Sequence, residues 1–192
     1  MENRYEREDL QNALRVLREG GVILYPTDTV WGIGCDPTNE QAVQKIYDLK
    51  RRADSKAMLL LTDSMAKVQA YVTDVPDVVW DLVECAEKPL TVIYPQGRNL
   101  ATNLIAQDGS VGIRITNEAF SKQLCMRFKK PIVSTSANVS GQPTPAFFDE
   151  ISEEIKAGVD YIVQARQDDR EKKQPSSIIK FEKNGTFAII RE

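Results

Sequence analysis

Small hydroxyl and amide side chains are dense in one stretch of the chain, "STSANVSGQPTP" at residues 134–145, called here the Ser/Asn stretch. It follows an apolar pair and contains six such groups, namely Ser134, Thr135, Ser136, Asn138, Ser140 and Thr144. A connecting turn needs only one or two of them, with a Gly or a Pro. Hydroxyl and amide groups can also donate hydrogen bonds to phosphate and ribose oxygens without adding charge. The stretch is therefore either an elaborate loop or a surface that binds a ligand rich in acceptor atoms.

A cluster of cations occupies the segment "KRRADSK" at the end of a predicted helix, and its members are Lys50, Arg51, Arg52 and Lys56. Cations at a helix C-terminus interact favourably with the helix dipole, but only by ~0.3–1 kcal/mol each. Four cations within seven residues exceed that need. Arginine binds phosphate as a planar fork and lysine as a point charge, so the cluster is suited to a polyphosphate.

The segment "PTDTVWGIG" at residues 26–34 places polar side chains directly after a predicted buried strand. Open α/β sheets bind ligands at such strand ends. Thr27, Asp28 and Thr29 lie between the strand and the aromatic Trp31. Taken alone, this segment favours an Asx-type turn rather than a binding site.

An arginine lies inside the predicted strand "SVGIRI" at residues 110–115. Arg114 alternates with Ile113 and Ile115, so its side chain lies on the opposite face of the strand from theirs. It is either a solvated residue on the outer face of a sheet or, on a concave inner face, a clamp for a carboxylate or a phosphate.

The composition excludes several kinds of active site. The chain has 192 residues and no histidine, so it cannot build a Ser-His-Asp site, a Cys-His site or a His-ligated zinc site. Its three cysteines are widely spaced, and neither a Walker A nor a GxGxxG sequence occurs. The net charge of −3 argues against a general nucleic-acid coat protein, although a local basic patch remains open. Chemistry must rest on Lys, Arg, hydroxyl, carboxylate and backbone groups, with an oxygen-ligated ion such as Mg²⁺ as the remaining metal option.

Strands and helices alternate along the chain, with hairpin signals in the middle and at the end. We therefore predict one α/β domain over residues 1–192, built on a single mixed sheet flanked by helices. A hairpin is expected to turn at Asn184 and Gly185. The segment "QARQDDREKKQ", 164–174, is interpreted as a solvated loop, more mobile than functional. Helices are predicted over 6–19, 39–52, 64–71, 76–86, 117–129 and 148–157, and strands over 22–28, 57–62, 90–95, 110–116, 131–135 and 159–163.

The bulk values predict a globular protein that is not associated with a membrane. Hydrophobic residues make up 42% and charged residues 28%, which is enough to form a core. No apolar run approaches the ~20 residues that span a bilayer. The cysteines are interpreted as reduced, mostly buried thiols, so we expect a cytoplasmic location.

The four stretches described above, in this order over nearly the whole chain, resemble the YrdC family. The similarity is greatest at the run SAN-x-SG-x-P-[ST]-P in the Ser/Asn stretch. Members of that family are L-threonylcarbamoyladenylate synthases, which convert L-threonine, bicarbonate and ATP into threonylcarbamoyl-AMP and pyrophosphate, the first step toward the t6A modification of tRNA. The resemblance implies a twisted mixed α/β sheet with a concave basic face, in a short form without an additional C-terminal domain.

The resemblance also implies roles for individual residues. Lys50 and Arg52 would act in catalysis by offsetting the charge of the triphosphate. Contacts with L-threonine would come from Thr29, Arg114, Ser134 and Ser177. Contacts with ATP would come from Arg52, Lys56, Ser110, Ser136, Asn138, Thr144 and Arg191. The protein would hold no metal of its own, Mg²⁺ would arrive with ATP, and no organic cofactor is expected.

The sequence departs from the family pattern at four places. One is Ala57, where a proline is common before the following strand. Trp31 stands where a tyrosine is usual, and the Lys-Gly-Arg-Pro element reads Lys50-Arg51-Arg52-Ala53. The late Ser-Thr-Val-Val-Asp pattern appears as "SSIIK" at 176–180, which affects the assignment of Ser177.

We expect a mechanism without a covalent enzyme intermediate. The threonine amine attacks bicarbonate or CO₂, and the resulting carbamate attacks the α-phosphorus of ATP. The alternative is a non-catalytic module that binds double-stranded RNA or tRNA on the same concave face. A second alternative is a relative that uses another amino acid. The expected partners are the three substrates, possible tRNA contacts and the downstream t6A transferase proteins.

Overall fold

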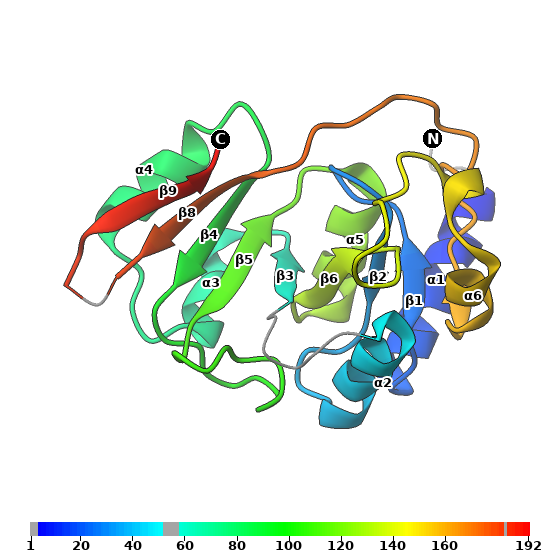
Figure 1. Cartoon of the computed structure of the whole chain (residues 1–192), viewed down its shortest axis with the longest axis horizontal. Coiled ribbons are helices and arrows are strands. Elements are labelled where there is room, and N and C mark those ends of the chain that lie inside the picture. The colour runs from blue at the N-terminus through cyan, green and yellow to red at the C-terminus, as the bar shows by residue number, and fades with distance from the viewer. Residues whose placement is uncertain (1–3, 52–57, 183) are drawn as a thin grey trace.

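A nine-stranded sheet runs through the part of the chain that the computed structural model describes, residues 4–51, 58–182 and 184–192 (Figure 1). The strand order is β7-β1-β2-β6-β3-β5-β4-β8-β9. The pairs β1/β7, β3/β5 and β4/β8 are parallel and the other five are antiparallel, so the prediction of a mixed α/β sheet is confirmed. The strands are β1 Ile23–Tyr25, β2 Gly32–Gly34, β3 Leu59–Thr62, β4 Leu90–Tyr94, β5 Val111–Ile115, β6 Ile132–Ser136, β7 Tyr161–Ile162, β8 Ser177–Phe181 and β9 Phe187–Arg191.

The helices lie close to their predicted positions. They are α1 Arg4–Arg18, α2 Glu40–Lys50, α3 Met65–Tyr71, α4 Asp77–Glu84, α5 Ala119–Phe128 and α6 Glu153–Ala157, with a short 3-10 helix, η1, at Phe148–Glu150. The single helix predicted over 148–157 is wrong, because Ile151 is extended and the hydroxyl of Ser152 begins a new helix by accepting from the Ile155 N–H. Strand β2 was missed, because it has only three residues, two of them glycines, and begins only two residues after the polar turn.

Helix α2 ends where the basic segment begins. Asn39 caps the helix as predicted, with its side chain accepting from the Ala42 N–H at 3.0 Å. Arg51 adopts a left-handed conformation, φ 48°, and its N–H bonds the Asp48 carbonyl at 3.0 Å. The helix therefore stops at Lys50 instead of continuing to 52.

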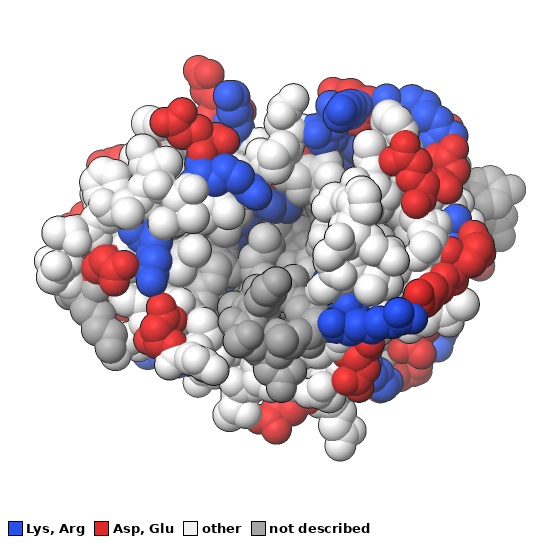
Figure 2. All heavy atoms as spheres, viewed as in Figure 1, with Lys and Arg blue, Asp and Glu red and all other residues white. Residues whose placement is uncertain are grey.

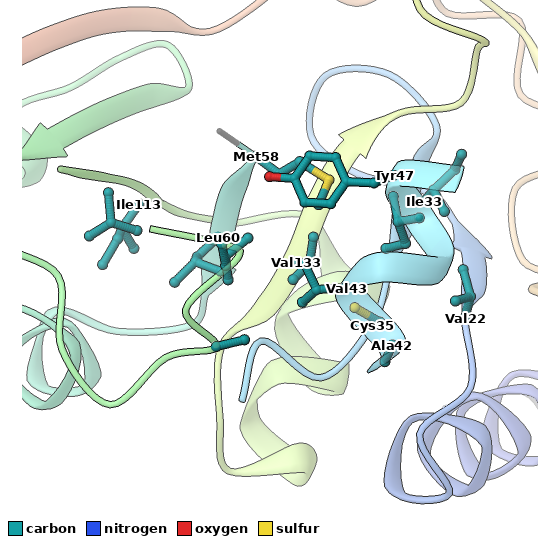
Figure 3. Close-up of a cluster of buried hydrophobic side chains, with 14 of the residues drawn as sticks. Val22, Ile33, Cys35, Ala42, Val43, Tyr47, Met58, Leu60, Ile113 and Val133 are labelled. Carbon is teal, nitrogen blue, oxygen red and sulfur yellow. The ribbon is translucent and has the colours of Figure 1, made fainter. Parts of the chain in front are cut away.

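Helices cover the two faces of the sheet to different extents. On one face, α2 packs through Val43 and Tyr47 against sheet residues that include Ile33 and Val133 (Figure 3). On the other face, α1 and α5 cover only part of the sheet, including Leu61 of β3. Successive residues of one strand belong to different cores, one beneath α2 and the other beneath α1 and α5, because their side chains point to opposite faces of the sheet.

The thiols and the helices agree with a globular chain. Cys35 and Cys125 are buried, Cys85 is exposed, and all three are free, as predicted. Within the described ranges, every helix is too short or too polar to cross a bilayer.

Gly34 is a position where the sheet tolerates no side chain. A Cβ there would lie 2.5 Å from the Val133 carbonyl oxygen and 2.7 Å from Tyr25 Cε1. Tyr25 is fully buried and donates its hydroxyl to the same carbonyl at 3.2 Å, so neither neighbour can move freely. We predict that Gly34→Ala lowers the free energy of unfolding by ~1–3 kcal/mol.

Gly112 on β5 is the matched control, since the nearest atom to a Cβ there is 3.6 Å away, an ordinary contact. Gly112→Ala should leave the melting temperature nearly unchanged. Equal melting temperatures for the two variants would contradict the packing argument.

Candidate functional site

A cavity of about 610 Å³ opens over the strands that α1 and α5 leave uncovered. The space-filling view is hollowed near its middle, and Lys and Arg side chains gather along the upper edge of the hollow (Figure 2). Its volume lies within the range of small-molecule sites, ~300–1,000 Å³.

The strand register explains which side chains line the floor. Arg114 on β5 pairs with Thr91 on β4, Thr91 with Ile178 on β8, and Ile178 with Arg191 on β9. Directly paired residues share a face of the sheet, so these four side chains, called here the Arg114 row, all point into the cavity. On the other side of Arg114, the row continues to Leu61 and Ile132, which α1 and α5 cover.

A β-bulge is needed to complete this row. The register shifts by one residue between Ile178 and Ile179, so Ile179 pairs with Ile189 while Ile178 pairs with Arg191. Without the bulge, Arg191 would lie opposite Ser177 and on the other face. The bulge therefore brings a cation from the last residues of the chain to the cavity.

The charge of the lining has one sign. Among the described lining residues, four are cationic, Arg114, Lys172, Lys173 and Arg191, and none is Asp or Glu. The whole chain has a net charge of −3, so this concentration is local. Such a lining favours an anionic ligand.

Arg114 is buried on the inner face, so the alternative of a solvated outer-face residue is wrong. Its side chain is 4% exposed, and Nη2 lies 2.8 Å from Asp28 Oδ1. The same nitrogen donates to Thr29 Oγ1 at 3.2 Å. Its Nε finds no hydrogen-bond partner among the described residues. One buried donor of the guanidinium thus has no partner among the described residues.

The turn between β1 and β2 carries Asp28, the ion-pair partner of Arg114. Thr27 and Thr29 stabilise this turn. Burial raises the pKa of the Asp28 carboxyl above its ordinary value, and the positive charge of Arg114 opposes that rise. Thr27 Oγ1 donates to the Val30 carbonyl at 2.6 Å and lies 3.2 Å from Thr29 Oγ1. The segment 26–34, for which a plain turn was favoured, is therefore both a turn and a wall of the cavity.

Hydroxyl groups also line the cavity. Ser134, Ser136 and Thr144 of the Ser/Asn stretch line the cavity, as does Ser110 before β5. The Ser110 N–H donates to Asp108 Oδ1 at 2.9 Å. The pKa of Asp108 is lowered to about 2, mainly by a hydrogen bond from the Ser110 side chain and next by the one from the Ser110 N–H. These predicted residues are brought together at one site.

Two other predicted residues do not line the cavity. Lys50 is almost fully buried, and its ammonium donates to the carbonyl oxygens of Ser136 and, at 2.5 Å, of Asn138. The Asn138 amide donates to the carbonyls of Val139, at 3.1 Å, and Gln142, at 2.8 Å. Both side chains hold the backbone of the Ser/Asn stretch in place, and their predicted contact with a ligand stays a prediction.

Ser176, rather than Ser177, faces the cavity. Ser177 pairs with Leu90, and the cavity lining does not include it. Ser176 is 2% exposed, and its Oγ lies 2.9 Å from Thr91 Oγ1. Arg191 donates to the Ser176 carbonyl at 2.8 Å and to its Oγ at 3.3 Å. Strand alternation from Ile178 thus places Ser176 on the cavity side, and the predicted role of Ser177 stays a prediction.

Lys172 and Lys173 are site residues that sequence reasoning missed. They belong to residues 164–176, called here the strap, which crosses from the β7 end of the sheet to β8 (Figure 1). This includes the segment that was interpreted as a solvated loop. Arg52 and Lys56 lie outside the described residues, so their roles stay predictions.

A family model described as telomere recombination, Sua5/YciO/YrdC, matches residues 15–192. A threonylcarbamoyl-AMP synthase from Pseudoalteromonas translucida is 35% identical over 161 residues, which cover 82% of this chain and 86% of that protein. One from Vibrio cholerae is 32% identical over 166 residues, 85% of this chain and 88% of that protein.

Solved structures share the fold. E. coli YciO matches with a TM-score of 0.82 at 24% identity, over 97% of this chain and 89% of that one. P. abyssi Sua5 complexed with L-threonine matches with a TM-score of 0.80 at 22% identity, over 90% of this chain. This chain spans about half the length of that Sua5 protein, 50%. Because the family model covers most of the sequence, the chain belongs to the Sua5/YciO/YrdC family.

Proposed function

We propose that the protein is an L-threonylcarbamoyladenylate synthase, which forms threonylcarbamoyl-AMP and pyrophosphate from L-threonine, bicarbonate and ATP. The observation that carries the proposal is the cavity lining, in which four cations and a wall of hydroxyl groups occur without a carboxylate. The names of the sequence relatives and the L-threonine in P. abyssi Sua5 support it. The reaction transfers an adenylyl group. Its product would be used in the t6A modification of tRNA.

The amino-acid end of the site would be built on Arg114. Its Nε is buried and lacks a partner among the described residues, and a substrate carboxylate would supply one. Thr29 and Ser134 line the same part of the cavity and would add hydroxyl contacts. The ion pair with Asp28 fixes the guanidinium before substrate binds, which lowers the entropic cost of binding.

The nucleotide end would use the neutral wall and the outer cations. Ser110, Ser136 and Thr144 can donate to phosphate and ribose oxygens, and Arg191 can add a charge-assisted hydrogen bond. Lys50 and Asn138 would act through the backbone they hold rather than by touching ATP.

The chemistry needs positioning more than an acid–base side chain. Threonine, after its ammonium has lost a proton, attacks the carbon of bicarbonate through nitrogen, forming a carbamate and releasing water. A carbamate oxygen then attacks the α-phosphorus of ATP, the bond to the bridging α–β oxygen breaks, and pyrophosphate leaves. A chain without histidine can accelerate such steps by holding the reactants together and stabilising developing negative charge.

A magnesium ion held by the protein does not fit the described lining. Mg²⁺ prefers carboxylates and phosphate oxygens, and the lining residues offer hydroxyl groups and cations instead. Mg²⁺ would therefore be bound by the triphosphate of ATP and not by a site on the protein.

The RNA-binding alternative is less favoured. A duplex needs many phosphate contacts over an extended surface, whereas these cations converge on one cavity of small-molecule size. Direct tRNA contact, transfer of the product to the downstream t6A proteins and a cytoplasmic location remain parts of the proposal.

The proposal predicts pyrophosphate release that requires all three substrates. Purified protein with ATP, bicarbonate and L-threonine should release pyrophosphate and form an adenylate that mass spectrometry detects. Omitting threonine should abolish release, and replacing it with L-serine tests for a relative with another substrate. Tight binding of tRNA or double-stranded RNA with no threonine-dependent release would instead support the binding module.

Replacement of Arg114 should separate the two ends of the site. Arg114→Ala should lower threonine-dependent turnover by about 100-fold or more, because the carboxylate loses its buried partner, while ATP affinity changes little. Calorimetry with ATP and with threonine measures both. Loss of ATP binding with threonine binding preserved would reverse the assignment.

Because Arg114→Ala also leaves Asp28 unpaired, Arg114→Lys serves as the second variant. It keeps the charge but loses the planar fork, so it should fold and remain strongly impaired. Melting temperatures identify any loss that comes from unfolding alone.

Ser136 and Asn138 should differ in what they affect. Ser136→Ala removes a hydroxyl from the cavity wall and should lower turnover roughly 5- to 20-fold with an unchanged melting temperature. Asn138→Ala removes two hydrogen bonds to backbone carbonyls and should lower the free energy of unfolding by ~1–2 kcal/mol. An unchanged melting temperature for Asn138→Ala, together with lost ATP affinity, would return Asn138 to the binding site.

A further inference from the structure

The strap is fixed to the body of the protein on both sides of the cavity. On the β7 side, Arg166 pairs with Glu118 at 3.1 Å and with Asp169 at 2.6 Å, and donates to the Thr27 carbonyl at 3.3 Å. On the β8 side, buried Ser176 bonds Thr91 and Arg191. The chain between these anchors must therefore cross the cavity along a defined path.

A third anchor lies next to the lysines. Arg170 binds Asp149 through two parallel hydrogen bonds of 3.0 and 3.1 Å, and its guanidinium lies 5.7 Å from the Phe147 ring centroid. Planar bidentate pairs fix geometry as well as adding energy. Lys172 and Lys173 follow within three residues, so their position over the cavity is set by Arg170.

The two lysines add positive charge to the cavity lining, and Lys172 is exposed to solvent. Lys172 has no ion pair with any residue of the described ranges. Lys173 pairs with Glu171, whose side chain is 70% exposed, so the pair is weak and screened. Neither lysine is needed to hold the strap, since the three anchors do that, and both have ammonium groups that a ligand can use.

We propose that Lys172 and Lys173 bind the β- and γ-phosphates of the nucleotide and the departing pyrophosphate, so that the strap forms the phosphate side of the cavity. The inference rests on the proposed function and extends it to a subsite. Arg114 lies deep in the site and is already oriented by Asp28, which suits a small carboxylate. The strap lysines are point charges on long side chains that are more exposed than Arg114, which suits a polyphosphate that must enter and leave.

The test compares Lys172→Ala/Lys173→Ala with a charge-matched control, Lys45→Ala/Lys122→Ala. Lys45 and Lys122 lie on α2 and α5 and do not line the cavity. Calorimetry measures the affinities for inorganic pyrophosphate, ATP, AMP and L-threonine at two salt concentrations. A third variant, Lys172→Arg/Lys173→Arg, keeps the charges.

We expect the alanine pair to weaken pyrophosphate and ATP binding roughly 5- to 20-fold at low salt, and less at high salt. AMP and threonine affinities should change less than about twofold, the arginine pair should bind like wild type, and the control should be unaffected.

Equal losses in the control, equal losses for AMP and pyrophosphate, or no loss at all would overturn the inference. Pyrophosphate binding by the wild type is measured without turnover, so this result is separate from that of the proposed reaction. A protein that binds pyrophosphate through the strap but makes no adenylate would contradict the function alone. Threonine-dependent synthesis unaffected in the alanine pair would contradict the strap alone.

Discussion

Burial of one guanidinium is the constraint on which the rest of the site depends. Arg114 is 3% exposed, and a charge so far from water is stable only with a partner. Asp28 supplies that partner from the turn between β1 and β2, although β6 and β3 separate β2 from β5 in the sheet. The ion pair therefore ties a turn to a strand across the sheet and brings Thr29 with it. Because both charges are partly satisfied before a ligand arrives, the site can keep its geometry when empty.

The cavity exists because helices cover one face of the sheet more completely than the other. Residues such as Leu60 and Val133 point to the core beneath α2, whereas Leu61 points to the core beneath α1 and α5. The second core ends next to Arg114, and the same row of the sheet then carries Thr91 and Arg191 into solvent-accessible space. A strand can thus be apolar along its length for packing and polar at one position for binding. The neighbouring strands supply the other polar residues of the site at the positions that pair with it.

Local signals in the sequence predicted the features that depend on local physics. Asn39 caps α2, and the final hairpin turns at Asn184 and Gly185 with a positive φ of 83° at the glycine, because capping and turn geometry are set within a few residues. Ser176 was missed because the face that β8 turns to the cavity is set by its pairing with β4, a strand far away in the sequence. Lys172 was missed because a run of charges looks the same whether it is solvated or crosses a cavity.

The cations at the cavity have two different roles, positioning the site and facing the ligand, which composition alone cannot separate. Lys50 and Arg170 position the site without lining the cavity. Lys50 donates to two carbonyls of the Ser/Asn stretch, and Arg170 fixes the strap. Arg114 and Arg191 face the cavity from a rigid sheet. A catalyst that lacks histidine has to rely on how well its reactants are aligned, and alignment is best supplied by a sheet. The part of the site that the sheet supplies therefore lies where an amino acid would have to be recognised, and the strap lysines lie where a polyphosphate would have to be released.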